Sequence, residues 1–190
     1  MLVHILQENL LRALLRTSRI VPNKPQLPVL QNVLISTDEG KIKITATNLE
    51  TTESVWVGAK IEKEGGLCVS SRLLSDFVSS LPQGTVQVSV KEGALLLQCN
   101  KFKATIPGVS KEEFPPAFSF SKNKGVSIQR EDLVSAASQV AFAAATDEGR
   151  PLLTGVKIIK SDERLVFAAT DGYRLSVKRT DLNMKEEFNI

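Results

Sequence analysis

The sequence repeats itself at a constant offset of 123 residues, and no gap is needed to keep the two copies aligned. The identical pairs include Val3 and Val126, Ile5 and Ile128, Glu8 and Glu131, Leu10 and Leu133, Ala13 and Ala136, Pro28 and Pro151, Leu30 and Leu153, Val33 and Val156, Ile35 and Ile158, Ala46 and Ala169, and Thr47 and Thr170. Solenoid repeats have periods of roughly 20 to 50 residues, so a period this long indicates a duplicated domain.

The second copy is shorter than the first, because the offset places Ile190 opposite Leu67. We therefore expect a complete domain in residues 1–120 and the N-terminal half of a second domain in residues 121–190. The counterpart of residues 68–120 is expected to be missing from the second copy.

Residue patterns in the first copy predict the plan of one domain. Gln7–Ser18 repeats apolar residues at helical spacing, and so does Ser70–Leu81, which begins with serines suited to capping a helix. Strands are predicted where β-branched residues are frequent, at Leu2–Ile5, Val29–Ser36, Lys41–Thr47, Thr52–Ile61, Val86–Val90 and Leu95–Ile106. A turn at Glu92–Gly93 joins the last two, and residues 108–125 are predicted to be a linker. The pattern indicates an α+β domain of two helices and antiparallel strands.

Composition excludes several classes of protein. The 24 basic residues against 21 acidic ones do not by themselves indicate a nucleic-acid-binding protein. No run of about 18 uncharged apolar residues is present and the N-terminal stretch is no signal peptide, so we expect a cytoplasmic location. Two cysteines, Cys68 and Cys99, and the single His4 predict neither a disulfide framework nor a zinc site. We expect both thiols to lie in the core.

Catalysis is the rival class of function, and the sequence offers little for it. Asp147, Glu148 and Asp171 are the acidic residues that a metal site would use. The motifs HExxH and GxSxG, a Walker loop and a cysteine–histidine pair do not occur. His4 lies in a predicted strand, and Ser127 takes its place in the second copy. We therefore predict that the chain is not an enzyme and that it uses no metal or cofactor.

Five separated stretches also resemble one known family. They are LPVLQNVLI at 27–35, TATNLE at 45–50, EEFPP at 112–116, FAAATDEGRPLLTGV at 142–156 and ATDGYRLS at 169–176. In this order and spacing they are similar to the bacterial DNA sliding clamp, the beta subunit of DNA polymerase III. The resemblance implies the DNA-clamp fold, in which duplicated domains each pack two helices on antiparallel sheets. It also implies three domains per protomer and a homodimeric ring with its helices inside, of which the third domain is expected to be absent here.

A clamp that slides on DNA of any sequence should contact phosphates and avoid pinning contacts with bases. On the predicted helix Gln7–Ser18, Leu10, Leu11, Leu14 and Leu15 occupy one face, and Arg12, Arg16 and Arg19 cluster on the other. The alternative is a solvated surface helix with a Glu8–Arg12 pair. The resemblance implies DNA contact for Lys24, at the tip of a proline-rich loop, and makes Arg72 and Arg150 further candidates. The first helix of the second copy has no arginine stripe.

The resemblance further implies two protein-binding surfaces. A pocket for short apolar peptides from the polymerase and the clamp loader is expected at Leu153, Thr170, Gly172, Tyr173, Arg174 and Leu175. Without the resemblance, TDGYR would be interpreted as an ordinary β-turn. At the ring interface, Phe102 matches an apolar residue of an edge strand, and Lys101 and Lys103 flank it in the way that protects such strands from aggregation.

The function implied is that of a DNA sliding clamp, a processivity factor that encircles duplex DNA and tethers the replicative polymerase. Double-stranded DNA, the polymerase catalytic subunit and the clamp loader are the expected partners, and no membrane is expected. The alternative is a protein-binding module that uses the clamp domain without encircling DNA.

Overall fold

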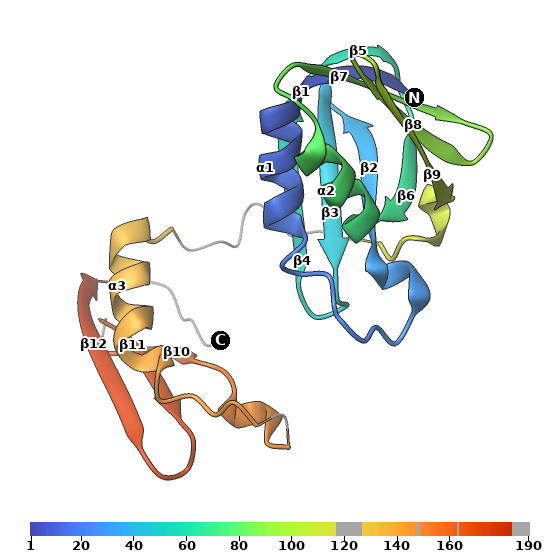
Figure 1. Ribbon diagram of the computed structural model, residues 1–190. Helices are drawn as coiled ribbons and strands as arrows, with labels where there is room; N and C mark the ends of the chain where they lie inside the picture. The colour runs from blue at the N-terminus through green and yellow to red at the C-terminus, as the bar shows by residue number, and fades with distance from the viewer. Residues whose placement is uncertain (117–126, 148, 163, 184–190) are drawn as a thin grey trace. The chain divides into compact units, whose positions relative to one another are not determined.

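The computed structural model describes residues 1–116, 127–147, 149–162 and 164–183. The chain divides into two compact units, Met1–Ser119 and Phe120–Ile190 (Figure 1). Each unit has its own cluster of buried apolar side chains. Each unit is therefore described by itself.

The first unit alternates strands with two helices. Its elements are β1 (Leu2–Leu6), α1 (Gln7–Thr17), the 3-10 helix η1 (Pro28–Gln31), β2 (Asn32–Asp38), β3 (Lys41–Thr47), β4 (Thr52–Gly58), β5 (Lys60–Lys63), β6 (Gly66–Ser70), α2 (Ser71–Ser80), β7 (Thr85–Lys91), β8 (Ala94–Cys99), β9 (Phe102–Val109) and the 3-10 helix η2 (Lys111–Glu113). The strands form one antiparallel sheet in the order β4-β3-β2-β6-β9-β8-β7-β1-β5.

The two helices lie side by side against this sheet and enclose the core (Figure 1). Leu10 and Leu14 of α1 and Leu74 and Val78 of α2 are buried in the same cluster as the inward-facing residues of the strands. Burying each such side chain contributes roughly 1.5 to 3 kcal/mol. A buried hydrogen bond also links the two helices, because the side-chain amide of Gln7 in α1 donates to the Val78 carbonyl in α2 at 2.8 Å.

The second unit contains one helix and three strands. Its described elements are α3 (Arg130–Ala141), the 3-10 helix η3 (Pro151–Leu153), β10 (Lys157–Ser161), β11 (Arg164–Thr170) and β12 (Leu175–Asn183). The strands form an antiparallel sheet in the order β10-β11-β12, and α3 packs on β11 and β12. Ala136, Val140 and Phe167 are among the buried residues of its core.

The duplication is visible in the strand register as well as in the sequence. The pair Ile35–Ile44 of β2 and β3 recurs 123 residues later as Ile158–Phe167. Likewise the last pair of β3 and β4, Thr47–Thr52, recurs as Thr170–Leu175. The first half of the first unit and the described part of the second unit are thus built on one plan.

Three predicted strands were wrong in their extent. Val29–Ser36 begins as η1 over Pro28–Gln31, because Pro28 suits the first position of a helical turn, and β2 follows only from Asn32. Thr52–Ile61 is broken at Ala59, and its last part belongs to β5, which pairs with β1. Leu95–Ile106 is a hairpin of β8 and β9, because Asn100 adopts the left-handed conformation that asparagine tolerates.

Two further expectations need correction. The predicted linker at 108–125 is partly structured, since β9 continues to Val109, η2 follows and Phe114 is buried; residues 117–126 lie outside the described part. On α1, Leu15 is 54% exposed and not part of the buried face, because the sheet and α2 cover a narrower stripe than four leucines. The predicted cap of α2 is confirmed, as the Ser70 hydroxyl accepts from the Leu73 amide at 3.4 Å.

Both cysteines are buried, as expected, and no disulfide joins them. Burial, with a smaller contribution from the carboxylates of Glu113 and Glu112, raises the pKa of the Cys68 thiol to about 11. None of the helices in the described ranges has the length and apolar character needed to span a bilayer.

Candidate nucleic-acid and peptide sites

The arginines of α1 lie on the face opposite its buried leucines. Arg12 and Arg16 are exposed, while Ala13 and Leu14 between them are buried. Arg19, which was predicted to continue this face, lies in the turn after α1 ends at Thr17 and is also exposed. Arg12 and Arg16 line a groove of about 320 Å³ between α1 and β4. The Arg16 Nε atom lies 3.5 Å from a carboxylate oxygen of Glu53 on β4, so part of its charge is already compensated.

Two more predicted cations belong to the first unit. Lys24 is exposed in the loop between α1 and η1. Arg72 lies in the first turn of α2, where it is exposed and has its Nε atom 3.8 Å from Asp76. The structure thus exposes all five first-unit candidates for DNA contact, with Arg16 and Arg72 also in ion pairs.

The equivalent groove of the second unit has different chemistry. It has a volume of about 270 Å³ and lies between α3 and β12. At the offset of 123, Asp132 takes the place of Asn9 and Ser135 that of Arg12. The helical side of this groove therefore carries Asp132 and no arginine, and its two cations, Lys178 and Arg179, come from β12 instead.

Arg150, the sixth predicted cation, belongs to the second unit. Its Nη1 atom would lie 3.4 Å from a Cβ added at Gly172, so its guanidinium approaches the TDGYR turn. This placement brings Arg150 together with the residues predicted for peptide binding.

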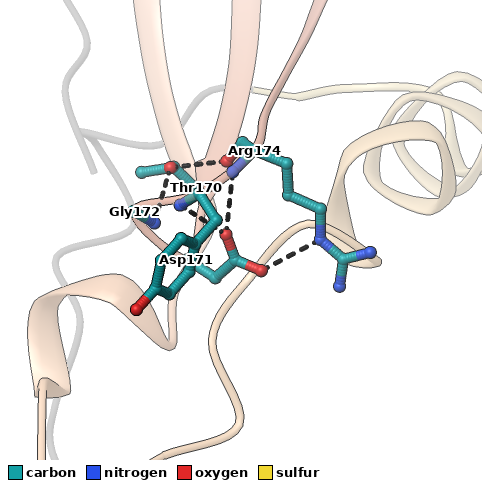
Figure 2. A network of polar contacts seen from close by, with 5 residues as sticks. Thr170, Asp171, Gly172 and Arg174 are labelled. Atoms are coloured by element: carbon teal, nitrogen blue, oxygen red, sulfur yellow. Dashed lines mark hydrogen bonds and ion pairs between the residues drawn. The ribbon is translucent and has the colours of Figure 1, made fainter.

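The TDGYR turn is held by a network of short hydrogen bonds (Figure 2). The Asp171 carboxylate accepts from the amides of Tyr173 and Arg174 at 2.9 and 3.0 Å and from the Arg174 Nε at 3.0 Å. The Thr170 hydroxyl donates to the Arg174 carbonyl at 2.6 Å and accepts from the Gly172 amide at 3.0 Å. The two backbone amides are the main reason why the pKa of Asp171 is lowered, and the Arg174 charge adds to them.

A pocket of about 520 Å³ lies beside this turn, between η3 and the sheet. It is lined by Pro151, Leu152, Gly155, Val156, Lys157, Ala168, Ala169, Thr170 and Leu175. Thr170 and Leu175 are the two predicted peptide-site residues that line it. Most of its lining residues are small or apolar, which suits the burial of an apolar side chain.

The other predicted peptide-site residues surround the pocket without lining it. Leu153 is half-buried in η3, and Gly172 is at the tip of the turn with a positive φ of 90°. Tyr173 is 93% exposed, and the Arg174 guanidinium lies 5.7 Å from the centre of the Phe142 ring. Leu153, Gly172, Tyr173 and Arg174 are therefore near the pocket, but the structure gives them no place in its wall.

Several lining residues escaped the sequence-based prediction. Leu152, which is 96% exposed, and Ala168 both line the pocket. In the first unit the equivalents of Ala168 and Leu175 are Thr45 and Thr52. Comparing the two copies would have signalled the site, because hydroxyls of one copy are replaced by a smaller and by an apolar residue in the other.

The predicted ring-interface residues lie on a sheet edge. From Phe102 to Pro107, β9 pairs with β8, and its pairs with β6 are Gly108 and Val109 only. Within the described residues, the other side of the Phe102–Pro107 stretch is therefore unpaired. Phe102 is 41% exposed, and the Lys101 amine lies 5.8 Å from its ring centre.

No group of three metal-ligating side chains occurs within the described ranges. Of the three acidic residues considered for a metal site, Glu148 lies outside the described part. Asp147 accepts from the Gly149 amide at 2.9 Å, and Asp171 is engaged in the turn. These carboxylates act in local turns.

Two consecutive α+β units that repeat one strand register, with helices packed on antiparallel sheet, define a protein of the DNA-clamp class. Residues 1–118 match the family described as DNA polymerase III beta subunit, N-terminal domain, and residues 127–190 match its central domain. The chain belongs to the DNA polymerase III beta subunit family, the beta sliding clamps.

Individual relatives agree with this assignment. The beta sliding clamp of Streptomyces coelicolor is 32% identical over 94% of this chain and 47% of its own length. The crystal structure of the DNA polymerase III subunit beta from Pseudomonas aeruginosa is 26% identical, with a TM-score of 0.91 over all of this chain and 52% of the other. The beta chain from Streptococcus pneumoniae is 27% identical, with a TM-score of 0.90, over all of this chain and 53% of the other.

The chain spans about half the length of these relatives. The family is that of a non-catalytic accessory subunit of a bacterial DNA polymerase that acts in DNA replication, which agrees with the expectation that the chain is not an enzyme.

Proposed function

We propose that this chain forms two consecutive domains of a DNA sliding clamp, which encircles duplex DNA and tethers the replicative polymerase. The single observation that carries the proposal is the division of α1 into a buried leucine face and an exposed face with Arg12 and Arg16, to which the turn after the helix adds the exposed Arg19. Long, exposed cations contact phosphates without reading bases, which is the chemistry that sliding requires.

The experiment that tests encirclement uses topology. The protein encoded by the full reading frame is loaded onto nicked circular DNA and then exposed to high salt, which screens phosphate contacts. A clamp stays linked to the circle and leaves it when the DNA is cut to a linear form. Loss of the protein from the intact circle at high salt would count against a clamp.

The pocket at β11 and β12 is proposed to bind short apolar peptides of the polymerase and of the clamp loader. Apolar lining with a few polar groups at the rim is typical of a site that holds one buried anchor side chain. Arg150 and Arg174 lie beside Gly172 and Asp171 at the turn, and Asp171 compensates the charge of Arg174 in part, so an acidic residue of the peptide would interact mainly with Arg150.

The Phe102–Pro107 edge of β9 is proposed to join a second protomer in a ring. Its unpaired backbone offers hydrogen bonds to another strand, and Phe102 offers an apolar contact. Exchanging Phe102 for Asp should weaken association of the full-length protein in sedimentation. An unchanged association would exclude this edge as the interface.

A second candidate function is a protein-binding module that does not encircle DNA. The observation in its favour is the helix α3, whose groove carries Asp132 and Ser135 where the first unit has Asn9 and Arg12. Such a module would bind peptides at the β11–β12 pocket but would dissociate from circular DNA at high salt.

A further inference from the structure

The first unit contains a polar pocket that includes Arg72, one of the candidate DNA contacts above, together with residues not considered so far. It has a volume of about 460 Å³ and lies between the C-terminal end of α1, the following loop, η1 and the first turns of α2. The side of α2 that faces it consists of Ser71, Arg72, Ser75 and Asp76. Because these positions are i, i+1, i+4 and i+5, they form one stripe along the helix. We call this cavity the α2 pocket.

Two hydroxyls on this stripe lack hydrogen-bond partners among the described residues. Ser71 is only 3% exposed, and its hydroxyl makes none of the hydrogen bonds found in the described structure. The Ser75 Oγ atom is enclosed and also unpartnered. Within the described ranges only the Ser75 Oγ atom is both enclosed and unpartnered, whereas the unpartnered Ser71 Oγ atom keeps access to the pocket, so Ser71 is the hydroxyl that a bound molecule can reach.

The electrostatics of the α2 pocket favour an anion. The N-terminus of α2 carries a partial positive charge, and its first turn contains Arg72 and no acidic residue. Asp76 lies one turn further on and pairs with Arg72 at 3.8 Å. An anion in the pocket would therefore compete with Asp76 for the guanidinium.

We propose that the α2 pocket binds a phosphate-type oxyanion, with Arg72 and the start of α2 supplying charge and Ser71 supplying a hydroxyl. Two sources share this chemistry, a backbone phosphate of DNA and free inorganic phosphate. The assignment of the oxyanion to DNA rests on the proposed clamp function, whereas the binding of an oxyanion in the α2 pocket does not. Bound phosphate would accept from the Ser71 hydroxyl, which has no other partner among the described residues, and would engage a cation that is otherwise shared with Asp76.

The test uses the full chain with inorganic phosphate as the probe, followed by amide chemical shifts in NMR spectra. We expect saturable shifts at Ser71, Arg72 and Ser75. Arg72→Gln should weaken binding about tenfold, because it removes a charge-assisted hydrogen bond. Asp76→Asn should strengthen binding several-fold, because it removes a repulsive charge and frees Arg72. Arg130→Gln on α3, an exposed arginine also beside a carboxylate, is the matched control and should change nothing.

Opposite effects of R72Q and D76N are the signature of an anion site. Both side chains are largely exposed, so both variants should fold, which the dispersion of the same spectra verifies. Absence of saturable shifts, or weaker binding in D76N, would overturn the α2 pocket as an oxyanion site even if duplex DNA still binds through α1.

A short duplex added to the phosphate-bound chain separates the two sources. We expect the duplex to displace phosphate and to shift the same amides. If the duplex binds the chain but does not displace phosphate, DNA is not the source of the oxyanion. The α2 pocket would then remain a site for free phosphate. A duplex that does not bind the chain at all would contradict the proposed DNA contact of α1, independently of the phosphate result.

Discussion

Asn48 and Asp171, which are 123 residues apart, close the same turn with the same side-chain atom. The Oδ1 atom of Asn48 accepts from the amides of Glu50 and Thr51 at 3.1 and 2.7 Å. The Oδ1 atom of Asp171 accepts from the amides of Tyr173 and Arg174 at 2.9 and 3.0 Å. The turn is therefore part of the duplicated framework, and the second copy differs in holding it with a titratable group.

This difference predicts an acid-sensitive turn in the second unit. The folded-state pKa of Asp171 is below its ordinary value, so its contribution to stability is present above the unfolded pKa of about 3.9. It is lost as the pH falls through the folded pKa. The amide shifts of Tyr173 and Arg174 should report this loss below about pH 4.

Asp171→Asn should abolish that titration and keep the turn, because Asn48 shows that an amide oxygen makes the same two bonds. The reciprocal variant Asn48→Asp should give the first-unit turn a titration that it now lacks. If the amides of D171N still moved over the same pH range, another group would be responsible.

The repeat allowed much of the fold to be predicted, since a constant offset carries both the helix and the strand register from one copy to the other. What it could not predict were the breaks within runs of strand-forming residues. Asn100 turns the chain between β8 and β9 inside a run that looks like one strand, and Ala59 separates β4 from β5. Such positions depend on which neighbour each half pairs with, which is a tertiary property.

The pocket was harder to predict than the turn beside it. Thr170, Gly172 and Tyr173 stand out in a sequence, whereas Ala168 contributes to the cavity only because its side chain is small. Its equivalent, Thr45, is 3% exposed, and its hydroxyl lies 3.0 Å from that of Ser54. A cavity made by a small residue becomes recognisable only when the two copies are compared.

Copying the first-unit residues into the second unit should impair the pocket. Ala168→Thr adds bulk to the lining, and Leu175→Thr, which restores the residue type of Thr52, removes an apolar wall. We expect either change to weaken the binding of a short leucine-containing peptide at least about tenfold, since burying such a side chain is worth roughly 1.5 to 3 kcal/mol. Chemical-shift titration measures the affinity.

The matched control is Leu73→Thr, since Leu73 in the first unit is 57% exposed and Leu175 is 67% exposed. It should leave peptide binding unchanged. Equal binding by A168T, L175T and the unaltered chain would place the peptide elsewhere.

The arginines of α1 predict a salt dependence of DNA binding. Each phosphate contact contributes about 0.9 to the slope of log K against log salt for duplex DNA. The double variant R12Q/R16Q should therefore lower the slope by roughly 2 without changing any preference for sequence. Fluorescence anisotropy of a labelled duplex between low and moderate salt measures it.

Glu53→Gln provides a control of opposite sign, because it frees Arg16 from its 3.5 Å ion pair. It should strengthen duplex binding modestly, consistent with the small worth of an exposed pair. An unaltered slope in R12Q/R16Q would show that α1 does not contact phosphates.

Cys68 gives a prediction for alkaline conditions. Its thiol has an ordinary pKa near 9 and a folded-state pKa of about 11, so at pH 8 it remains protonated in the folded protein. In a Cys99→Ser background, iodoacetamide should react with Cys68 far more slowly in the folded than in the unfolded chain. Because the folded-state pKa of Cys68 is raised, the contribution of this thiol to the stability of the folded protein is complete below its unfolded pKa. That contribution is lost as the pH rises towards 11. Glu113→Gln, which removes one neighbouring carboxylate, should lower the pKa and extend stability to higher pH. Equal alkylation rates in the folded and unfolded chain would mean that Cys68 is not enclosed.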